Sequence, residues 1–223
     1  MILAVLFDLD GLMVDSEPHA LATWEMVMAR RGVQLDQAAI DAMLGRRLDD
    51  TARALIERFG LSDDPFALGA EKTDLQIEQL DGNVPAMPGL LELIDALEAR
   101  GVKRAVASSG LRRYVHAVLH LIGLAGRFDA VVTGDDVANG KPAPDVFLRA
   151  AGRLSVPPAA CLALEDAPNG IAAAKAAGMA CIAVPNAFTR ALDLSGADLV
   201  LPSLLAVRDA LDAGWPSSSR EPV

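Results

Sequence analysis

The chain has 223 residues, of which 52% are hydrophobic, and its formal net charge is −10. A chain of this length can bury a sizeable core in one large domain or two smaller ones, and its apolar content excludes an intrinsically disordered protein. The excess of negative charge repels phosphate backbones. We therefore expect no nucleic-acid partner, and any site for an anionic substrate must supply its own local positive charge.

The two cysteines, Cys161 and Cys181, both lie in apolar runs. They fit small buried hydrophobic side chains better than a disulfide framework or a Cys-x-x-Cys site. The first apolar run meets Asp8 too early to be a signal peptide, and no uncharged apolar stretch is long enough to span a bilayer. We therefore expect a cytoplasmic protein with no membrane partner.

Along most of the chain, short apolar runs alternate with longer amphipathic segments. The runs that we predict as strands are residues 2–7, 104–107, 130–132, 161–164 and 181–184. Their hydrophobicity is continuous rather than alternating, which is typical of strands buried on both faces of a parallel sheet. Helical spacing and turn-forming ends predict helices over residues 90–101, 111–123, 145–154, 169–178 and 203–214.

Residues 15–85 break this alternation. Their helical stretches are residues 17–32, 36–44, 49–60 and 66–80, with no strand-like run among them. We interpret the segment as an all-helical insertion after the first strand. The expected fold is α/β, with a Rossmann-like parallel-sheet core that is discontinuous over residues 1–14 and 86–213, an inserted all-helical cap domain at residues 15–85 and a flexible tail at residues 214–223.

Polar side chains follow the predicted strands at the points where they end. In chain order they are Asp8 and Asp10, Ser108 and Ser109, Lys141, and Glu165 and Asp166. Ligands of open parallel sheets bind beyond the carboxyl ends of the strands, so we expect these groups to converge. Four carboxylates in one site require a counter-charge, and Mg²⁺ suits carboxylates that also meet a phosphate.

Asp8 and Asp10 lie one residue apart, so a regular strand would direct them to opposite sides. Both can serve one site if the chain turns at Gly11. The stretch Ser-Ser-Gly before a predicted helix is a suitable anion site, and Lys141 adds a positive charge. A metal, a lysine, amide donors and a carboxylate nucleophile together suit phosphoryl transfer through an aspartyl-phosphate. A second acid nearby can protonate the leaving oxygen and later activate water.

Four stretches carry a resemblance to a known family. "DLDGLMVDSE", "VASSG", "GKPAPDVF" and "ALEDAPNGI" resemble, in order, the four motifs of the haloacid dehalogenase superfamily. The likeness is strongest to its subgroup of sugar-phosphate phosphatases and β-phosphoglucomutases, and the insertion resembles the small helical cap of that superfamily. Dehalogenation is not expected, because that branch lacks the second aspartate.

The resemblance implies a role for each matching residue. Asp8 matches the nucleophile and a metal ligand, and Asp10 matches the general acid/base, whose backbone carbonyl would also bind metal. Ser108 matches the residue that holds the phosphate, and Lys141 matches the lysine that steadies nucleophile and phosphate. The metal-binding acidic pair is matched by Glu165 and Asp166. The resemblance further implies a cis Lys141–Pro142 bond.

The cap is expected to set substrate specificity. Gly45, Arg46 and Arg47 lie in a turn between predicted cap helices, where the specificity loop of the family tends to fall. We expect one of the two arginines to contact substrate, and the alternative is a solvated charge pair.

The expected function is that of a Mg²⁺-dependent phosphatase, most simply a monomer, that hydrolyses a small phosphate monoester such as a sugar or polyol phosphate. The first alternative is a β-phosphoglucomutase-type mutase. Its pattern is weakened here because Ala20 occupies the usual histidine site, with His19 one place early, and because Leu44 precedes Gly45. The second alternative is a phospho-receiver or metabolite-binding module, which would have no use for Asp10 or for a cap.

Overall fold

The fold is built on one parallel sheet of six strands in the order β3-β2-β1-β4-β5-β6. It is described by a computed structural model that covers residues 1–43, 48–80 and 84–214. In chain order the strands are β1 (Ala4–Phe7), β2 (Lys103–Ala107), β3 (Ala130–Val132), β4 (Cys161–Glu165), β5 (Ala180–Ala183) and β6 (Leu199–Val200). The five expected strands are confirmed to within two residues at each end, while β6 was not expected because two residues give no periodic signal.

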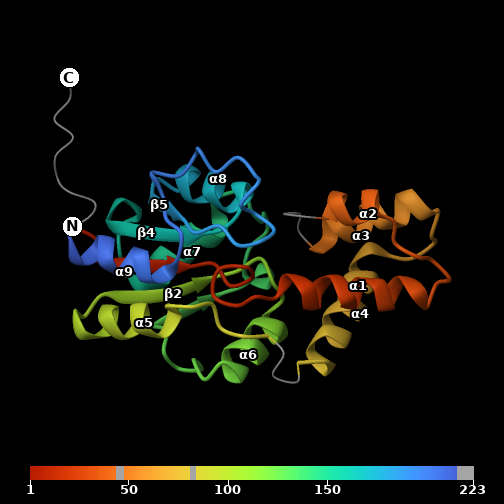
Figure 1. The fold of residues 1–223 in the computed structure, drawn as a ribbon, viewed down its shortest axis with the longest axis horizontal. Coiled ribbons are helices and arrows are strands. Elements are labelled where there is room, and N and C mark those ends of the chain that lie inside the picture. The colour runs from red at the N-terminus through yellow and green to blue at the C-terminus, as the bar shows by residue number, and fades with distance from the viewer. Residues whose placement is uncertain (44–47, 81–83, 215–223) are drawn as a thin grey trace.

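Helices cover both faces of the sheet (Figure 1). They are α5 (Leu90–Ala99), α6 (Arg112–Leu121), α7 (Asp145–Leu154), α8 (Pro168–Ala176) and α9 (Leu204–Asp212), with short 3₁₀ turns η1 (Gly134–Asp136) and η2 (Pro158–Ala160). Val5 and Phe7 of β1 pack in the cluster that includes side chains of α5, α6 and α9. Ala4 and Leu6 pack in the cluster on the other face, with α7 and α8. This two-sided burial explains why the strand sequences lack polar alternation.

The inserted segment forms a second, all-helical body beside the sheet (Figure 1). Its helices are α1 (Glu17–Ala29), α2 (Gln37–Met43), α3 (Leu48–Phe59) and α4 (Pro65–Glu78). They enclose a separate hydrophobic cluster that includes Trp24, Met28, Leu55 and Leu68. The expected Rossmann-like fold with a helical cap is thus confirmed. A separate core lets the cap hold its own shape without packing against the sheet.

Two connections join the cap to the sheet domain, and they run side by side. Val14, on the outgoing connection, forms bridges with Asp10 and with Ala86 on the returning one. Arg113 of α6 adds a contact across the two domains, donating to Asp74 of α4 with an Nε–Oδ1 distance of 2.6 Å. The domain limits at residues 15 and 85 stay predictions, and this pairing of the connections supports them. The tail expected at residues 214–223 lies, apart from Gly214, outside the described residues.

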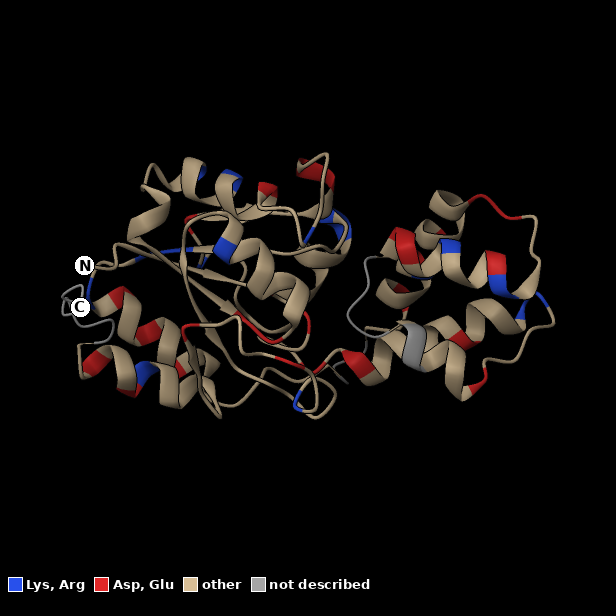
Figure 2. Ribbon diagram, turned by 90° about the horizontal axis from the view of Figure 1, so that it is seen from above, with Lys and Arg blue, Asp and Glu red and all other residues tan. Residues whose placement is uncertain are grey.

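Charged residues are distributed over the outer helices of both bodies (Figure 2). Figure 2 also shows acidic segments in the loops that lie between the sheet and the cap, which is where the site residues are expected. Within the part of the chain that the structure describes, none of the helices combines the length and the apolar character needed to cross a bilayer.

Candidate active site

Asp8 follows β1. From β1 the strand order runs through β2 and β3 on one side and through β4, β5 and β6 on the other. β1 pairs on one side with β2 and on the other with β4, so that Phe7 is in register with both Val106 and Leu164. The Asp8 N–H donates to the carbonyl of Leu164 at 3.1 Å, which extends the pairing with β4 by one bond. Asp8 therefore leaves the sheet at its switch point, where open α/β sheets form their ligand sites.

Three of the four expected carboxylates gather at this point. Asp8, Glu165 and Asp166 are all buried, and each offers an oxygen within 4.8 Å of those of the other two. Burial, reinforced by Glu165 and Asp10 and opposed by Lys141, raises the pKa of Asp8 to about 8. Burial and the charges of Asp8 and Glu165 raise the pKa of Asp166 well above its usual range. Such a group favours a cation, and its hard oxygen donors fit Mg²⁺.

Lys141 supplies one positive charge to this acidic group. Its Nζ donates to Asp8 Oδ1 at 2.5 Å and to Glu165 Oε1 at 2.6 Å, and its side chain is only 7% exposed. Burial favours the neutral amine, but the charges of Asp8 and Glu165 outweigh it and raise the pKa of Lys141. The lysine is therefore a fixed cation. The expected cis Lys141–Pro142 bond is confirmed.

Ser108 follows β2 and shapes the loop that leads into α6. The side chain is buried, its N–H donates to the carbonyl of Val132 at 3.0 Å, and its Oγ accepts from the Gly110 N–H at 3.0 Å. Ser109 and Gly110 then line a pocket. The serines do not cap α6, because its N-cap residue is Leu111.

The chain turns directly after Asp10, as expected. Gly11 has φ +79°, and a Cβ at this position would lie 2.5 Å from side-chain atoms of Asp166 and Asn186. Only glycine tolerates both the conformation and the close approach. The turn brings Asp10 to the same pocket as Asp8, although the Asp10 side chain is not part of the acidic group.

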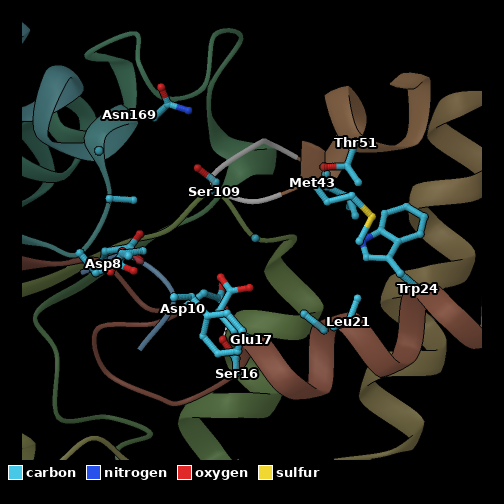
Figure 3. Close-up of a pocket in the computed structure, with 18 of the residues that line it drawn as sticks. Asp8, Asp10, Ser16, Glu17, Leu21, Trp24, Met43, Thr51, Ser109 and Asn169 are labelled. Carbon is cyan, nitrogen blue, oxygen red and sulfur yellow. Dashed lines mark hydrogen bonds between the residues drawn. The ribbon is translucent and has the colours of Figure 1, made fainter. Parts of the chain in front are cut away.

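A pocket of about 350 Å³ lies between the sheet and the cap (Figure 3). Leu21 and Trp24 of α1 point into it together with Met43 and Thr51, facing Asp8 and Asp10 across the space, while Glu17 lies beside Asp10. The cap side thus combines apolar side chains with polar ones, while the sheet side carries the acidic group and Lys141. Such a division suits a ligand whose charged group meets the sheet and whose body meets the cap.

Lys72 of α4 lines the cap side of this pocket. Its Nζ donates to Gln76 Oε1 at 2.5 Å and lies 5.9 Å from the centre of the Trp24 ring. Burial lowers the pKa of Lys72 to about 8, against the opposing charges of Asp10 and Glu17. The ammonium is therefore incompletely compensated and is available to a polar ligand group.

Comparison with known proteins identifies the family. The model of the haloacid dehalogenase-like hydrolases matches residues 2–178. The chain belongs to this family. The chain is 38% identical over 177 residues to fructose-1-phosphate phosphatase YqaB of Escherichia coli, covering 78% of this chain and 92% of that protein. It is 35% identical over 213 residues to protein CbbY of Rhodobacter capsulatus, covering 91% and 94%.

A solved structure agrees with these sequence matches. CbbY of Rhodobacter sphaeroides, crystallised in complex with phosphate, superposes with a TM-score of 0.85 at 29% identity, covering 93% of this chain and 96% of that one. The expectation of an enzyme, a phosphoric monoester hydrolase of the haloacid dehalogenase-like family, is confirmed by the comparisons. The individual roles assigned to Asp8, Asp10, Ser108, Lys141, Glu165 and Asp166 stay predictions.

Sequence reasoning missed three polar residues of this hydrolase that the structure brings to the site. They are Tyr114, Lys72 and Asn186. Tyr114 and Lys72 lie inside helices, where their spacing is that of packing or surface positions. Asn186 comes shortly after β5, so the rule that polar groups after strands mark the site would have found it. The expected specificity turn, Gly45, Arg46 and Arg47, lies outside the described residues.

Asn186 holds Asp166 in place. Its Nδ2 donates to Asp166 Oδ2 at 2.8 Å and to the Gly11 carbonyl at 3.1 Å, while its Oδ1 accepts from the backbone N–H groups of Phe188 and Thr189. Because these partners are two acceptors and two donors, they fix which atom of the Asn186 amide is the nitrogen and which is the oxygen. Asn186 therefore orients one predicted metal ligand from behind.

We expect Asn186→Ala to raise the Mg²⁺ concentration for half-maximal activity by about 10-fold, because an outer hydrogen bond typically contributes this much to metal affinity. The measurement is a Mg²⁺ titration of phosphate release at saturating substrate. Asn139→Ala is the matched control, since Asn139 is exposed and its Nδ2 donates to Asp145 Oδ1 at 3.1 Å. An unchanged titration in Asn186→Ala would contradict this role.

Proposed function

We propose that this hydrolase is a Mg²⁺-dependent phosphatase that hydrolyses a small sugar or polyol phosphate through an aspartyl-phosphate. The observation that carries the proposal is the Asp8 carboxylate, held by Lys141 beside two further buried acids in the pocket between the sheet and the cap. A carboxylate in this setting is suited to attack phosphorus. The relative named fructose-1-phosphate phosphatase supports the substrate class.

The metal would be held by Asp8, Glu165 and Asp166, with the Asp10 backbone carbonyl as a further proposed ligand. When bound, the ion neutralises charge on the phosphoryl oxygens and on the acidic group. Its presence also resolves an electrostatic problem of the folded chain, because three buried acids are otherwise balanced by Lys141 alone among the described residues around them.

The reaction follows from the positions of the side chains. An oxygen of Asp8 attacks phosphorus, and the bond from phosphorus to the leaving oxygen breaks while Asp10 gives that oxygen its proton. Asp10, now a carboxylate, takes a proton from the water that attacks the phosphorus of the aspartyl-phosphate. The P–O bond to Asp8 then breaks, which releases inorganic phosphate and restores both carboxyl groups. Lys141 and the Ser108 loop hold the phosphoryl oxygens throughout.

The pocket supports a small substrate. Its volume of about 350 Å³ suits a small phosphorylated metabolite. On the cap side, Leu21 and Trp24 offer apolar surface to the carbon face of a sugar or polyol, and Glu17 and Lys72 offer an acceptor and a donor to its hydroxyls. We retain the monomeric state, the cytoplasmic location and the lack of a nucleic-acid partner as predictions.

One contact favours hydrolysis over the mutase alternative. His19 points its Nε2 at the backbone carbonyl of Gln76, 3.0 Å away, and among the described residues Ala20 rather than His19 lines the pocket. A histidine tied to the cap backbone is not presented to a bound sugar phosphate. The structure therefore adds to the two departures from the mutase pattern seen in the sequence.

The test is phosphate release from a panel of sugar, polyol and glycolate phosphates, with Mg²⁺ and with EDTA. We expect release with at least one substrate in Mg²⁺ and none above background in EDTA. Conversion of β-glucose 1-phosphate to glucose 6-phosphate with little phosphate released would establish the mutase instead. Binding without turnover across the panel would favour the metabolite-binding module.

A further inference from the structure

Two hydroxyl groups bind the carboxylate of Asp10, and the mechanism above uses neither. The Tyr114 hydroxyl donates to Asp10 Oδ1 at 2.6 Å, and Ser16 Oγ donates to the same oxygen at 2.7 Å. Two donors occupy the acceptor positions of Oδ1. The second oxygen, Oδ2, is therefore the one left to exchange a proton with a ligand in the pocket.

The two donors belong to different parts of the molecule. Ser16 is the N-cap residue of α1, the first cap helix, but its hydroxyl does not cap that helix. It lies on the connection along which the cap joins the sheet domain. Tyr114 is in α6, which follows the loop of Ser108 and Ser109. Its hydroxyl is therefore anchored to the element that would hold the phosphoryl group, independently of the cap.

Tyr114 is held firmly. Its side chain is 4% exposed and packs in the hydrophobic cluster with Val115 and Val118 of the same helix. Burial, the charge of Asp10 and the hydrogen bond to it raise the pKa of Tyr114 well above its usual value of 10. The hydroxyl thus keeps its proton at physiological pH and remains a donor.

We propose that Tyr114 is a positioning residue for proton transfer: by holding Oδ1 of Asp10 from the rigid side of the site, it directs Oδ2 toward the leaving oxygen of the substrate. The inference rests on the proposed phosphatase function. It adds to that function a residue outside the four motifs, placed by tertiary structure alone. If the Asp10 carboxylate rotates about its side-chain bonds, its Oδ2 no longer reaches the leaving oxygen. Misplacement of a catalytic group by about 1 Å slows catalysis strongly.

A role in proton transfer predicts a dependence on the leaving group. An alcohol leaves as a poor alkoxide unless it is protonated as the bond to phosphorus breaks, whereas 4-nitrophenolate leaves readily without a proton. Loss of the Tyr114 hydroxyl should therefore slow transfer of the phosphoryl group from alkyl phosphates to Asp8 and leave transfer from 4-nitrophenyl phosphate nearly unchanged, which kcat/KM measures for each substrate. Loss of a merely structural contact would slow both.

The experiment compares wild type and Tyr114→Phe, both with Mg²⁺, on the best alkyl phosphate of the panel and on 4-nitrophenyl phosphate. For the alkyl phosphate we expect kcat/KM, which reports the steps up to formation of the aspartyl-phosphate, to fall about 10-fold, a part of the 100-fold or more that general acid catalysis contributes. For 4-nitrophenyl phosphate we expect kcat/KM within about twofold of wild type. Asp10→Asn should show the same selectivity in kcat/KM with a larger fall, while its kcat should fall for both substrates because Asp10 also activates the water of the second step.

Thr23→Val is the matched control, because the Thr23 hydroxyl is buried and donates to the His19 carbonyl at 2.8 Å within α1, away from the pocket. It should affect both substrates equally.

If Tyr114→Phe slows both substrates equally, or neither, the inference is overturned while the phosphatase function stands. If wild type hydrolyses no phosphate ester, the proposed function is wrong and the inference falls with it. A steeper dependence of log(kcat/KM) on leaving-group pKa across substituted phenyl phosphates gives a second, independent readout.

Discussion

Asp8→Asn is expected to reduce phosphate release to background, a loss of at least about 1,000-fold in kcat, because an amide cannot attack phosphorus and no other carboxylate occupies its position. Asp8 is bonded to Lys141 and lies at the end of β1 between two strands, so a nearly isosteric amide keeps the local packing. The measurement is phosphate release from the best substrate of the panel at saturating Mg²⁺. A variant with the wild-type rate would show that Asp8 is not the nucleophile.

The same substitution should not unfold the protein. The pKa of Asp8 is raised from 3.8 to about 8 by burial, so ionisation of this group opposes folding of the metal-free chain as the pH rises through that window. Removing the carboxylate removes this cost. We expect thermal unfolding in EDTA to show Asp8→Asn at least as stable as wild type at pH 8, with less difference at pH 4. Asp145→Asn, at the start of α7, is the control for activity and should stay near the wild-type rate.

Lys141→Met is expected to have the largest effect on stability. The lysine is 6% exposed and bonds to both Asp8 and Glu165, so its loss leaves two buried acids without their cation. Removing one partner of a buried ion pair typically costs about 3–5 kcal/mol. We expect urea unfolding in EDTA to show a loss of this size. We also expect kcat to fall at least about 100-fold, because the phosphoryl group loses a charge-assisted donor.

Two comparisons separate this effect from a general loss of packing. Lys175→Met breaks the exposed pair of Lys175 with Asp198 and should cost at most about 1 kcal/mol. Adding Asp8→Asn to Lys141→Met should recover part of the lost stability, because it removes one of the two uncompensated acids. If the double variant is no more stable than Lys141→Met, the destabilisation does not come from the buried charges.

The strands and helices of the sheet domain were predictable because buried elements have a recognisable pattern of apolar residues in the sequence. β1 and β4 are continuous apolar runs, and α7 has Pro144 and Asp145 at its start and a clear apolar face. Among the strands, β6 was not predicted, because its two residues form a strand by pairing with β5 rather than by any pattern of their own. In the same way, Asp8 and Glu165 were predictable as a group because parallel strands bring their carboxyl ends to one edge. Lys141 lies further beyond its strand, β3, and was predictable as their partner because its motif resembles that of the family.

The support of the site was not predictable in this way. Tyr114 has the helical spacing of a core residue and packs as one, so its sequence position gives no hint that its hydroxyl reaches Asp10, 104 residues earlier in the chain. The same holds for Lys72, which the cap turns toward the pocket. Asn186 lies after a strand, where the site is expected, but its hydrogen bonds to Asp166 and to the Gly11 carbonyl cannot be read from the sequence.

The amino-acid sequence was sufficient for the family, the α/β core with its helical cap, and the carboxylates and lysine that would carry out the chemistry. These properties depend on local periodicity and on the residues that follow strands, and both are visible in the sequence itself. Only the tertiary structure showed which groups orient those residues and what surface the cap presents to a substrate. Such contacts join segments far apart in the chain, and their hydrogen bonds depend on distances that spacing in the sequence does not determine.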